Sequence, residues 1–262
     1  MIRSLFTATT GMSAMQQNID VIANNLANVN TQGFKRSRAE FQDLLYRTLK
    51  MPGTATPTGN QVPTGIQIGM GSKLSAVTKL LTQGDMLQTE NQLDIAIQGR
   101  GFFQIQQPDG SVAYTRAGTF RSDSSGMLVN SDGLPLEPAI TIPEDATSIS
   151  IAENGEVSVM QAGSTTPNIL GTIEIASFIN PAGLLAMGSG LYTETDASGT
   201  ANAGIPGENE LGVLLQGYIE SSNVNVVEEL TGMIMAQRAY ELNSKAITTA
   251  DEMLQTANGT KR

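Results

Sequence analysis

Both ends of the chain carry apolar residues at a spacing of seven, and this spacing constrains the fold more than any other feature of the sequence. Near the N-terminus the residues seven apart are Leu5, Met12, Ile19 and Leu26, and those three further on are Ala8, Met15, Ile22 and Val29. Near the C-terminus they are Val226, Met233, Tyr240, Ile247 and Leu254. Heptads are typical of helices that pack along their length against other helices. We expect the two ends to be helices that pair as a coiled coil; the alternative is that both cover one face of an ordinary globular core.

The N-terminal segment is almost free of charge. Residues 4–34 contain one charged residue, Asp20. A helix that faces solvent normally carries charged residues on its outer side, and an unpaired charge costs several kcal/mol when it is buried among protein neighbours. We therefore expect this helix to be surrounded by more protein than one chain offers, which favours copies of the same chain as neighbours.

An asparagine-rich stretch at residues 23–35 is predicted to end this helix. Asn28, Asn30 and Gly33 suit the left-handed backbone of a helix C-cap. Asn24 and Asn25 fall inside the helix, where asparagine is a poor helix former. We expect these two side-chain amides to hydrogen-bond to neighbouring chains.

The next segments change character twice. Residues 36–50 are more charged and suit either an extended arm or a short helix. Residues 51–65 hold three prolines and three glycines, a composition that predicts a loop. Such a loop is either a flexible linker or a projection that becomes ordered against a neighbour.

Residues from about 70 to 220 favour β structure. Strands are predicted at residues 94–98, 102–106, 112–120 and 172–178, and a hairpin at residues 149–159 around Asn154 and Gly155. The predicted fold class is α+β, with paired terminal helices, a β-rich central domain and an extended Pro/Gly-containing connector. The expected domains are residues 1–34 with 222–262 (helical), 35–72 (connector) and 73–221 (β-rich).

Composition excludes most catalytic chemistry. The chain has no cysteine and no histidine, which removes thiolate nucleophiles, Cys/His zinc sites and histidine bases. The glycines at residues 69–73 fail the P-loop spacing, and residues 196–202 lack the later positions of a calcium loop. The net charge, 15 − 25 = −10, argues against nucleic acid as a partner. We expect no catalytic residue, cofactor or metal, no cleavable signal peptide and no membrane insertion.

Several motifs together resemble one protein family. They lie, in chain order, at residues 23–35, 99–103, 114–120, 222–230 and 235–245, and their sequences are similar to those of the bacterial flagellar rod and hook family. The family signature is carried by Asn24, Asn25, Asn28, Asn30, Gly33 and Phe34. The chain length and the Pro/Gly stretch are most similar to the distal-rod branch of the family, with the proximal-rod branch as the alternative. The residues of this rod-type segment are Tyr46, Pro52, Gly53, Pro57, Gly59, Pro63 and Gly65.

The resemblance implies a structural role. Subunits of this family polymerise helically into a hollow shaft, with the terminal helices as its inner tube and the β-rich domain outside. It implies export without a cleavable signal through the flagellar type III apparatus, and a place in the basal body from the periplasm to the outer membrane. The implied partners are further copies of the chain, proximal rod proteins, the hook protein and the L and P ring proteins. The residues expected to mediate self-assembly are Leu5, Met12, Met15, Ile19, Ile22, Leu26, Val226, Met233, Tyr240, Ile247 and Leu254.

Other classes of function give different expectations. A secreted β protein that binds glycans or a cell surface would use its helical ends only to form a small closed oligomer. A hydrolase would need a nucleophile and a base, and only carboxylates are available. For a polymer subunit, we expect the termini to be disordered before assembly, because they then lack their neighbours.

Overall fold

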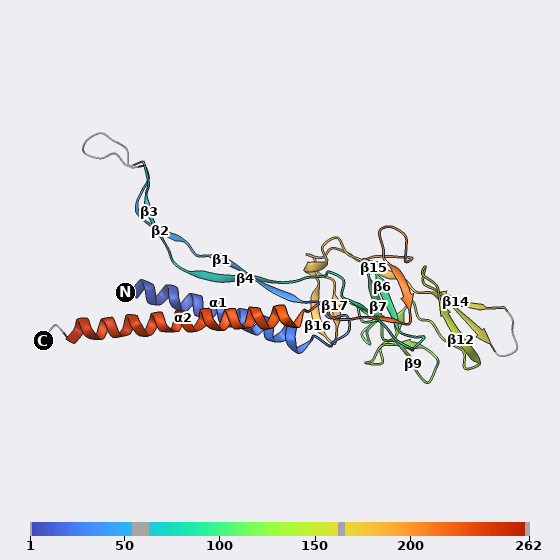
Figure 1. The fold of residues 1–262 in the computed structure, drawn as a ribbon. Coiled ribbons are helices and arrows are strands. Elements are labelled where there is room, and N and C mark those ends of the chain that lie inside the picture. Colours follow the sequence, from blue (N-terminus) through green and yellow to red (C-terminus); the bar gives the residue numbers. More distant parts are fainter. Residues whose placement is uncertain (1, 54–62, 162–165, 260–262) are drawn as a thin grey trace. The chain divides into compact units, whose positions relative to one another are not determined.

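The computed structural model describes residues 2–53, 63–161 and 166–259, and it has an α+β fold with a helix at each end and a β-rich middle. The chain forms two compact units, which we describe separately (Figure 1). The helical unit comprises residues 1–27, 37–78 and 225–262, and the β unit comprises residues 28–36 and 79–224. Each unit is therefore assembled from segments that are distant in the sequence.

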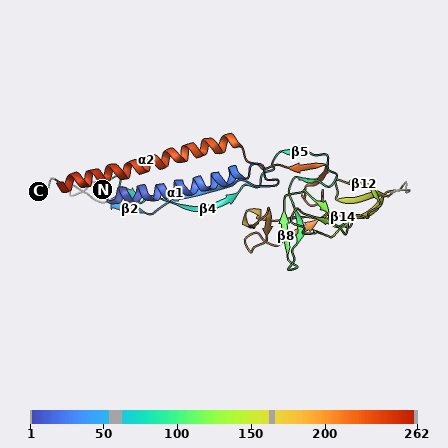
Figure 2. The ribbon, with the colours of Figure 1, turned by 90° about the horizontal axis from the view of Figure 1, so that it is seen from below.

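Two long helices dominate the helical unit. Helix α1 spans Ile2–Ala27 and helix α2 spans Val226–Gly259, and they lie side by side (Figures 1 and 2). The backbone N–H of Val227 donates to the Asn225 side chain at 3.0 Å, which caps the start of α2. Two glutamates in the first turn of α2 interact favourably with the helix dipole.

Residues 37–53 and 63–79 form an extended two-stranded arm, which resolves the ambiguity of residues 36–50 in favour of an arm. Strands β1 (Ser37–Asp43) and β4 (Ser72–Lys79) pair first, and β2 (Tyr46–Lys50) and β3 (Ile66–Gly69) pair further along the same two segments. The N–H of Leu44 donates to the Gly71 carbonyl at 2.8 Å and joins the two ladders. An added Cβ on Gly71 would lie 2.1 Å from the Thr10 hydroxyl oxygen, so the arm closely approaches α1 at this point.

The β unit contains one large sheet and several small ones. The large sheet has seven strands in the order β16-β17-β8-β7-β15-β18, with β11 also paired to β7. The β unit also contains a three-stranded sheet, β12-β13-β14, and the strand pairs β19-β6, β20-β5 and β10-β9. The bounds are β5 Met86–Gln88, β6 Ile95–Gln98, β7 Phe102–Gln106, β8 Val112–Thr115, β9 Arg121–Ser122, β10 Leu128–Val129, β11 Leu136–Glu137, β12 Ala146–Ile151, β13 Glu156–Gln161, β14 Asn168–Thr172, β15 Ile175–Ser177, η1 Pro181–Gly183, β16 Leu185–Gly188, β17 Leu191–Thr193, β18 Asn202–Gly204, β19 Val213–Gln216 and β20 Tyr218–Glu220.

The core of the β unit follows from the alternation of its strands. The residues of its main cluster include Ile95, Ile97, Phe103, Ile105, Phe120, Val157, Val159 and Ile175. Phe103 and Phe120 meet edge to face, with their ring centroids 5.1 Å apart. The predicted hairpin is confirmed: β12 and β13 pair around a turn in which Gly155 has a φ of +84°.

Two predicted strands are shorter than expected. The strand expected at residues 112–120 ends at Thr115, because the chain then turns at Gly118, where an added Cβ would lie 1.6 Å from the Ile95 carbonyl oxygen. The strand expected at residues 172–178 is divided between two sheets. Its first residue ends β14, and β15 begins at Ile175 after the chain has left the three-stranded sheet.

Candidate assembly interface

The helix–helix seam of the helical unit contains residues from both heptad series. On α1, Ile22 is buried and Leu5, Met12, Met15, Ile19 and Leu26 are half-buried. On α2, Met233, Ile247 and Leu254 are half-buried, whereas Val226 and Tyr240 are each 39% exposed. An added Cβ on Gly11 would lie 2.9 Å from the Asn243 amide nitrogen, so the two helices approach closely there. The buried apolar residues of the two helices are Ile22 and the alanines Ala8, Ala14, Ala236 and Ala250, whereas the other large side chains of the seam stay partly accessible.

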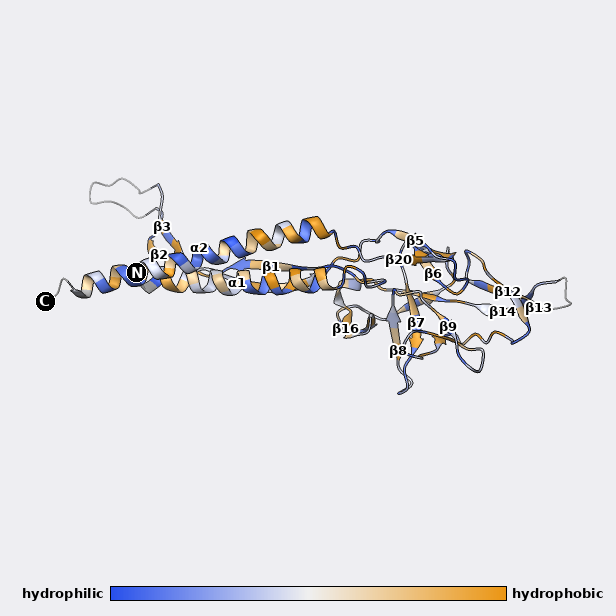
Figure 3. Ribbon diagram, turned by 60° about the horizontal axis from the view of Figure 1, so that its bottom comes forward, coloured by the Kyte–Doolittle hydropathy of each residue, from blue (hydrophilic) through white to orange (hydrophobic). Residues whose placement is uncertain are grey.

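A second apolar stripe, which the sequence analysis missed, lies on the side of α2 opposite the seam. Its residues are between 44% and 72% exposed, and Figure 3 shows apolar residues along this helix. At about 100° per residue they fall on one side of the helix. We call them the outer stripe: Val227, Leu230, Ile234, Met235, Leu242 and Met253. A helix that is apolar on two opposite sides is typical of one buried on both.

Of the signature asparagines, Asn25 makes its side-chain hydrogen bonds within the chain. Asn25 is buried, and its amide donates to Glu229 at 3.2 Å and to the Ser37 carbonyl at 2.8 Å, while its oxygen accepts from the Ser37 N–H. The expectation that Asn25 bonds to neighbouring chains is therefore wrong, because α2 and β1 already use its amide. Asn24 is exposed on α1.

The turn after α1 uses one left-handed residue rather than three. Helix α1 ends at Ala27, and Gly33 has a φ of +65°. Asn28 and Asn30 do not have a positive φ, so their expected role as left-handed caps is wrong. Asn28 instead accepts two hydrogen bonds from Thr31. The Thr31 N–H donates to the Asn28 backbone carbonyl at 3.1 Å, and the Thr31 hydroxyl donates to the Asn28 side-chain oxygen. The ring of Phe34 lies 5.4 Å from the ammonium group of Lys79.

A buried cluster of three charged residues ties together the segments of the β unit, and the sequence analysis missed it. One Glu220 oxygen lies 2.6 Å from Lys35 Nζ, and the other lies 2.6 Å from Arg116 Nε. Lys35 also donates to the Thr82 carbonyl, and Glu220 also accepts from the Gly84 N–H. We call Lys35, Arg116 and Glu220 the charged cluster.

The charges in this cluster oppose the cost of burial. Burial alone would raise the pKa of Glu220, but Arg116 and Lys35 outweigh it and hold the pKa below its ordinary value. Burial lowers the pKa of Lys35, and Glu220 opposes that shift. The guanidinium of Arg116 also donates to the backbone carbonyls of residues 97, 99 and 101. With one carboxylate and two cations, the cluster keeps one positive charge in excess.

The described residues of the rod-type segment lie on the part of the arm formed by β2 and β3. Tyr46 begins β2 and is exposed, as are Pro52, Gly53 and Pro63. An added Cβ on Gly65 would lie 2.6 Å from the Lys50 carbonyl oxygen, so only glycine fits between the two segments. Pro57 and Gly59 lie outside the described residues.

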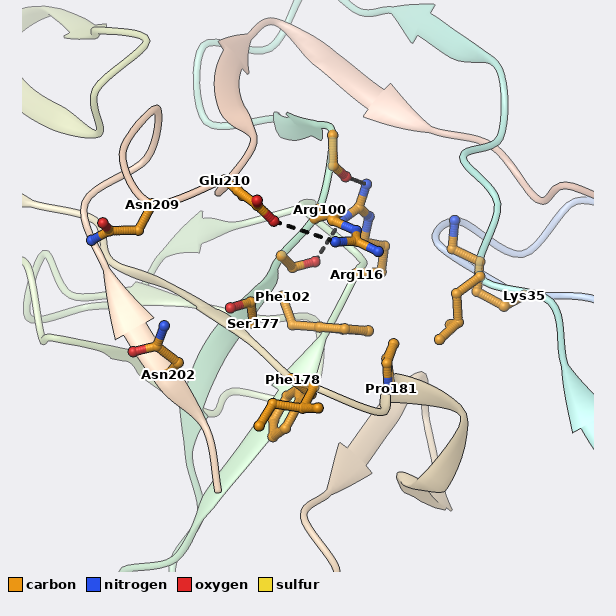
Figure 4. Close-up of a pocket in the computed structure, with 14 residues that line it drawn as sticks. Lys35, Arg100, Phe102, Arg116, Ser177, Phe178, Pro181, Asn202, Asn209 and Glu210 are labelled. Atoms are coloured by element: carbon orange, nitrogen blue, oxygen red, sulfur yellow. Dashed lines mark hydrogen bonds and ion pairs between the residues drawn. The ribbon is translucent and has the colours of Figure 1, made fainter. Parts of the chain in front are cut away.

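The β unit also contains a pocket of about 420 Å³ (Figure 4). Its lining includes the apolar residues Phe102, Phe178 and Ile179 and the cationic residues Lys35, Arg100 and Arg116. At its rim, Arg100 forms an ion pair with Glu210 at 3.6 Å. The pocket thus combines an apolar surface with positive charge.

Two classes of site have no candidate in the described part of the chain. No group of three or more Asp or Glu residues there is placed to hold a metal ion. Within the same residues, neither helix has an apolar stretch long enough to span a membrane.

Comparison with known proteins places the chain in a family. The family model described as "Flagella basal body rod protein" matches residues 5–35, "Flagellar hook protein FlgE/F/G D1 domain" matches residues 96–159, and "Flagellar basal body rod FlgEFG protein C-terminal" matches residues 215–260. The matches therefore include most of α1, part of the β unit and α2.

Full-length relatives carry the same family name. The chain is 52% identical over 264 residues to the flagellar basal-body rod protein FlgG of Borreliella burgdorferi, with 100% of both chains covered. It is 50% identical to the FlgG of Caulobacter vibrioides, with 97% of both covered. It is 49% identical to the FlgG of Buchnera aphidicola from Acyrthosiphon pisum, with 97% of this chain and 98% of that one covered. The chain belongs to the flagellar basal-body rod protein family, a family of structural proteins, which confirms the family expected from the sequence.

Proposed function

We propose that this chain is a structural subunit of the flagellar distal rod, and that it polymerises helically into a rigid hollow shaft that transmits torque. The observation that carries the proposal is the two-sided apolar character of α2. One side packs on α1, and the outer stripe remains exposed among the described residues of the helical unit, with Leu242 and Met253 in a shallow groove beside Ser4 of α1. Burial of this stripe is worth roughly 25 cal/mol per Å² of apolar surface, which favours assembly with further copies.

In this proposal the terminal helices form the inner tube of the shaft as coiled coils. The residues at seven-residue spacing from Leu5 to Leu26 and from Val226 to Leu254 form the seam, and the outer stripe meets neighbouring copies. The division into a terminal helical domain of residues 1–34 and 222–262, a connector at 35–72 and an outer β-rich domain at 73–221 is part of the same proposal. The coiled-coil part of the proposal is supported by the antiparallel packing of α1 and α2, in which Asn25 lies beside Glu229 and Gly11 lies beside Asn243.

The arm is the second element of the proposed polymer. The rod-type segment, from Tyr46 to Gly65, would brace neighbouring subunits and stiffen the shaft. Its support is the strong exposure of apolar residues on the arm, since Leu49, Met51 and Ile66 are each more than half exposed. Many repeated contacts of this kind add up along a polymer, and a contact between two different surfaces extends into a helical filament when the rotation between copies does not close a ring.

The proposed partners follow from the place of a distal rod. They are further copies of the chain, proximal rod proteins, the hook protein, the L and P ring proteins and the flagellar type III export apparatus. The proposed location is the basal body, from the periplasm to the outer membrane, and export would use no cleavable signal peptide. The names of the relatives support the basal-body rod as the setting.

Assembly of the purified chain tests the proposal. At high protein concentration we expect filaments in negative-stain electron micrographs and large particles in sedimentation velocity. The double variant Ile234→Glu, Leu242→Glu places charges on the outer stripe and should stay in the soluble fraction, because each buried charge would cost several kcal/mol. Helix content, measured by circular dichroism, should remain that of the unaltered chain.

A matched control uses exposed apolar residues of the β unit. The variant Met160→Glu, Ile169→Glu makes the same chemical change on β13 and β14 and should assemble normally. Assembly of the outer-stripe variant at the level of this control would contradict the proposal. Formation of a small closed oligomer by the unaltered chain would favour the glycan- or surface-binding alternative. Assemblies that serve only as the start or the cap of a rod would favour a proximal-rod or hook-type subunit.

A further inference from the structure

The pocket of the β unit has an uncovered apolar wall. Phe102 and Phe178 meet edge to face with ring centroids 5.9 Å apart, and beside them Ile179 is 95% exposed. Ile179 is the most exposed large apolar residue among the described residues. An isoleucine held this far into solvent next to an aromatic wall is typical of a surface that a partner covers.

The charge of the pocket selects an acidic partner. Its lining contains three cations, Lys35, Arg100 and Arg116, and one acid, Glu210. Glu220 lies behind the lining and neutralises one more charge through the charged cluster. The local balance is therefore 3 − 2 = +1, on a chain whose net charge is −10. An apolar side chain with a carboxylate beside it complements both properties of this pocket.

The arm of the helical unit presents this combination. At the corner between β1 and β2, Leu45 is 87% exposed, and the nearby acidic residue Asp43 is exposed as well. The hydrogen bond from the Leu44 N–H to the Gly71 carbonyl fixes the backbone at this corner. Leu45 is therefore held outward by an ordered ladder, so that docking it would cost little conformational entropy.

We propose that the pocket of one copy receives the β1–β2 corner of a second copy, with Leu45 against Phe178 and Ile179 and with Asp43 facing Arg100. The inference rests on the proposed polymer and names one of its contacts. Because the corner and the pocket are different surfaces, each copy offers one of each, so the contact repeats from copy to copy and extends a helix when the rotation between copies does not close a ring.

Disulfide cross-linking tests this contact directly. The chain has no cysteine, so a variant with Leu45→Cys and another with Ile179→Cys each carry a single thiol. After the two are mixed and mildly oxidised, we expect a covalent dimer that contains one of each. A mixture of Leu45→Cys with Ile169→Cys is the control, because Ile169 is also exposed on the β unit but lies on β14. The mixture is tested both in solution and in filaments, so the cross-link decides the contact whether or not filaments form.

A charge exchange provides the second test. Asp43→Arg and Arg100→Asp should each raise the concentration needed for assembly at least about tenfold, since an attractive pair becomes a repulsive one. The double exchange should bring it back to within about threefold of the unaltered chain. Circular dichroism spectra should be the same for all of these chains.

The outcomes separate this contact from the polymer as a whole. Filaments without a 45–179 cross-link, and with unchanged assembly of Arg100→Asp, would overturn the contact and leave the polymer intact. A chain that carries both cysteines and closes only on itself, without any dimer, would also overturn it. A cross-link between copies without filaments would support the contact and count against the polymer.

Discussion

Lys35 Nζ and Glu220 Oε1 lie 2.6 Å apart, and both side chains are almost completely buried. Lys35 directly follows Phe34, the last of the signature residues, whereas Glu220 ends β20, the last strand before α2. The pair therefore joins the two chain segments of the β unit that follow α1 and precede α2. Arg116 binds the other oxygen of the same carboxylate and brings in the turn after β8.

Removal of the carboxylate should strongly destabilise the β unit. Glu220→Ala leaves Lys35 and Arg116 buried without a counter-charge, and we expect a loss of about 3–5 kcal/mol in the free energy of unfolding. Urea unfolding followed by circular dichroism measures this change. Glu153→Ala, at an exposed position in the turn between β12 and β13, should change the free energy by less than about 0.5 kcal/mol. Similar losses in the two variants would show that the cluster adds no stability.

Stability should fall in acid because of the same carboxylate. The pKa of Glu220 in the folded chain lies below its ordinary value of 4.5, because Arg116 and Lys35 outweigh the effect of burial. A group with a lowered pKa stabilises the fold fully above its unfolded pKa, and this stabilisation disappears as the pH falls toward the folded pKa. Between about pH 6 and pH 3, the urea concentration at the unfolding midpoint should therefore decrease once the pH falls below about 4.5. The drop should be smaller in Glu220→Gln, and an equal drop in both would contradict this assignment.

Gly33 should not tolerate a side chain. Its φ is +65°, and an added Cβ would lie 2.7 Å from the Ala117 backbone nitrogen. Gly110, with a φ of +85° and nothing within 4 Å of an added Cβ, is the matched control. Gly110→Ala should cost about 1–2 kcal/mol for the left-handed backbone alone, and Gly33→Ala should cost clearly more because backbone must move as well. Equal midpoints of thermal unfolding for the two variants would contradict the packing argument.

Asn25 should contribute more to the helical unit than its position in a helix suggests. Asn25→Ala improves helix propensity but leaves the buried Glu229 carboxylate and both backbone groups of Ser37 without this partner. We expect a net loss of about 1–3 kcal/mol, measured by urea unfolding of the helical signal. Gln17→Ala, on the exposed side of α1, is the control and should be neutral or slightly stabilising. Equal effects of the two changes would show that the network around Asn25 is not stabilising.

The rod-type segment should set the stiffness of the proposed polymer. In filaments of a variant that lacks residues 52–65, we expect a shorter persistence length in electron micrographs, because braces between subunits are lost. A variant in which the same residues are replaced by glycine and serine at equal length separates the effect of sequence from that of length. Filaments of the deletion variant as stiff as those of the unaltered chain would exclude a bracing role.

The sequence predicted the parts of the fold that depend on local patterns. The terminal helices follow from heptads, and the β12–β13 hairpin follows from alternation around Asn154 and Gly155. The end of β8 could not be predicted, because it depends on how closely Gly118 approaches the Ile95 carbonyl, a contact made only in the folded sheet.

The charged cluster and the outer stripe were beyond the sequence analysis for different reasons. Lys35, Arg116 and Glu220 are brought together by the β unit from three distant segments, and nothing in the sequence near any one of them marks the others. The outer stripe had a visible signal, since Val227, Leu230 and Ile234 are spaced by three and four. A single seven-residue series describes one side of a helix, so the heptads of α2 carry no information about the opposite side.

The pairing of α1 with α2 requires both ends of the same chain. Asn25 and Glu229 are 204 positions apart, so α1 can pair with α2 only when nearly the entire polypeptide is present. A molecule cut short before Val226 would offer α1 nothing to lie against, however well its β unit had formed. Truncated copies would therefore lack the helix pair and could not enter a structure built on it, without any separate quality-control factor.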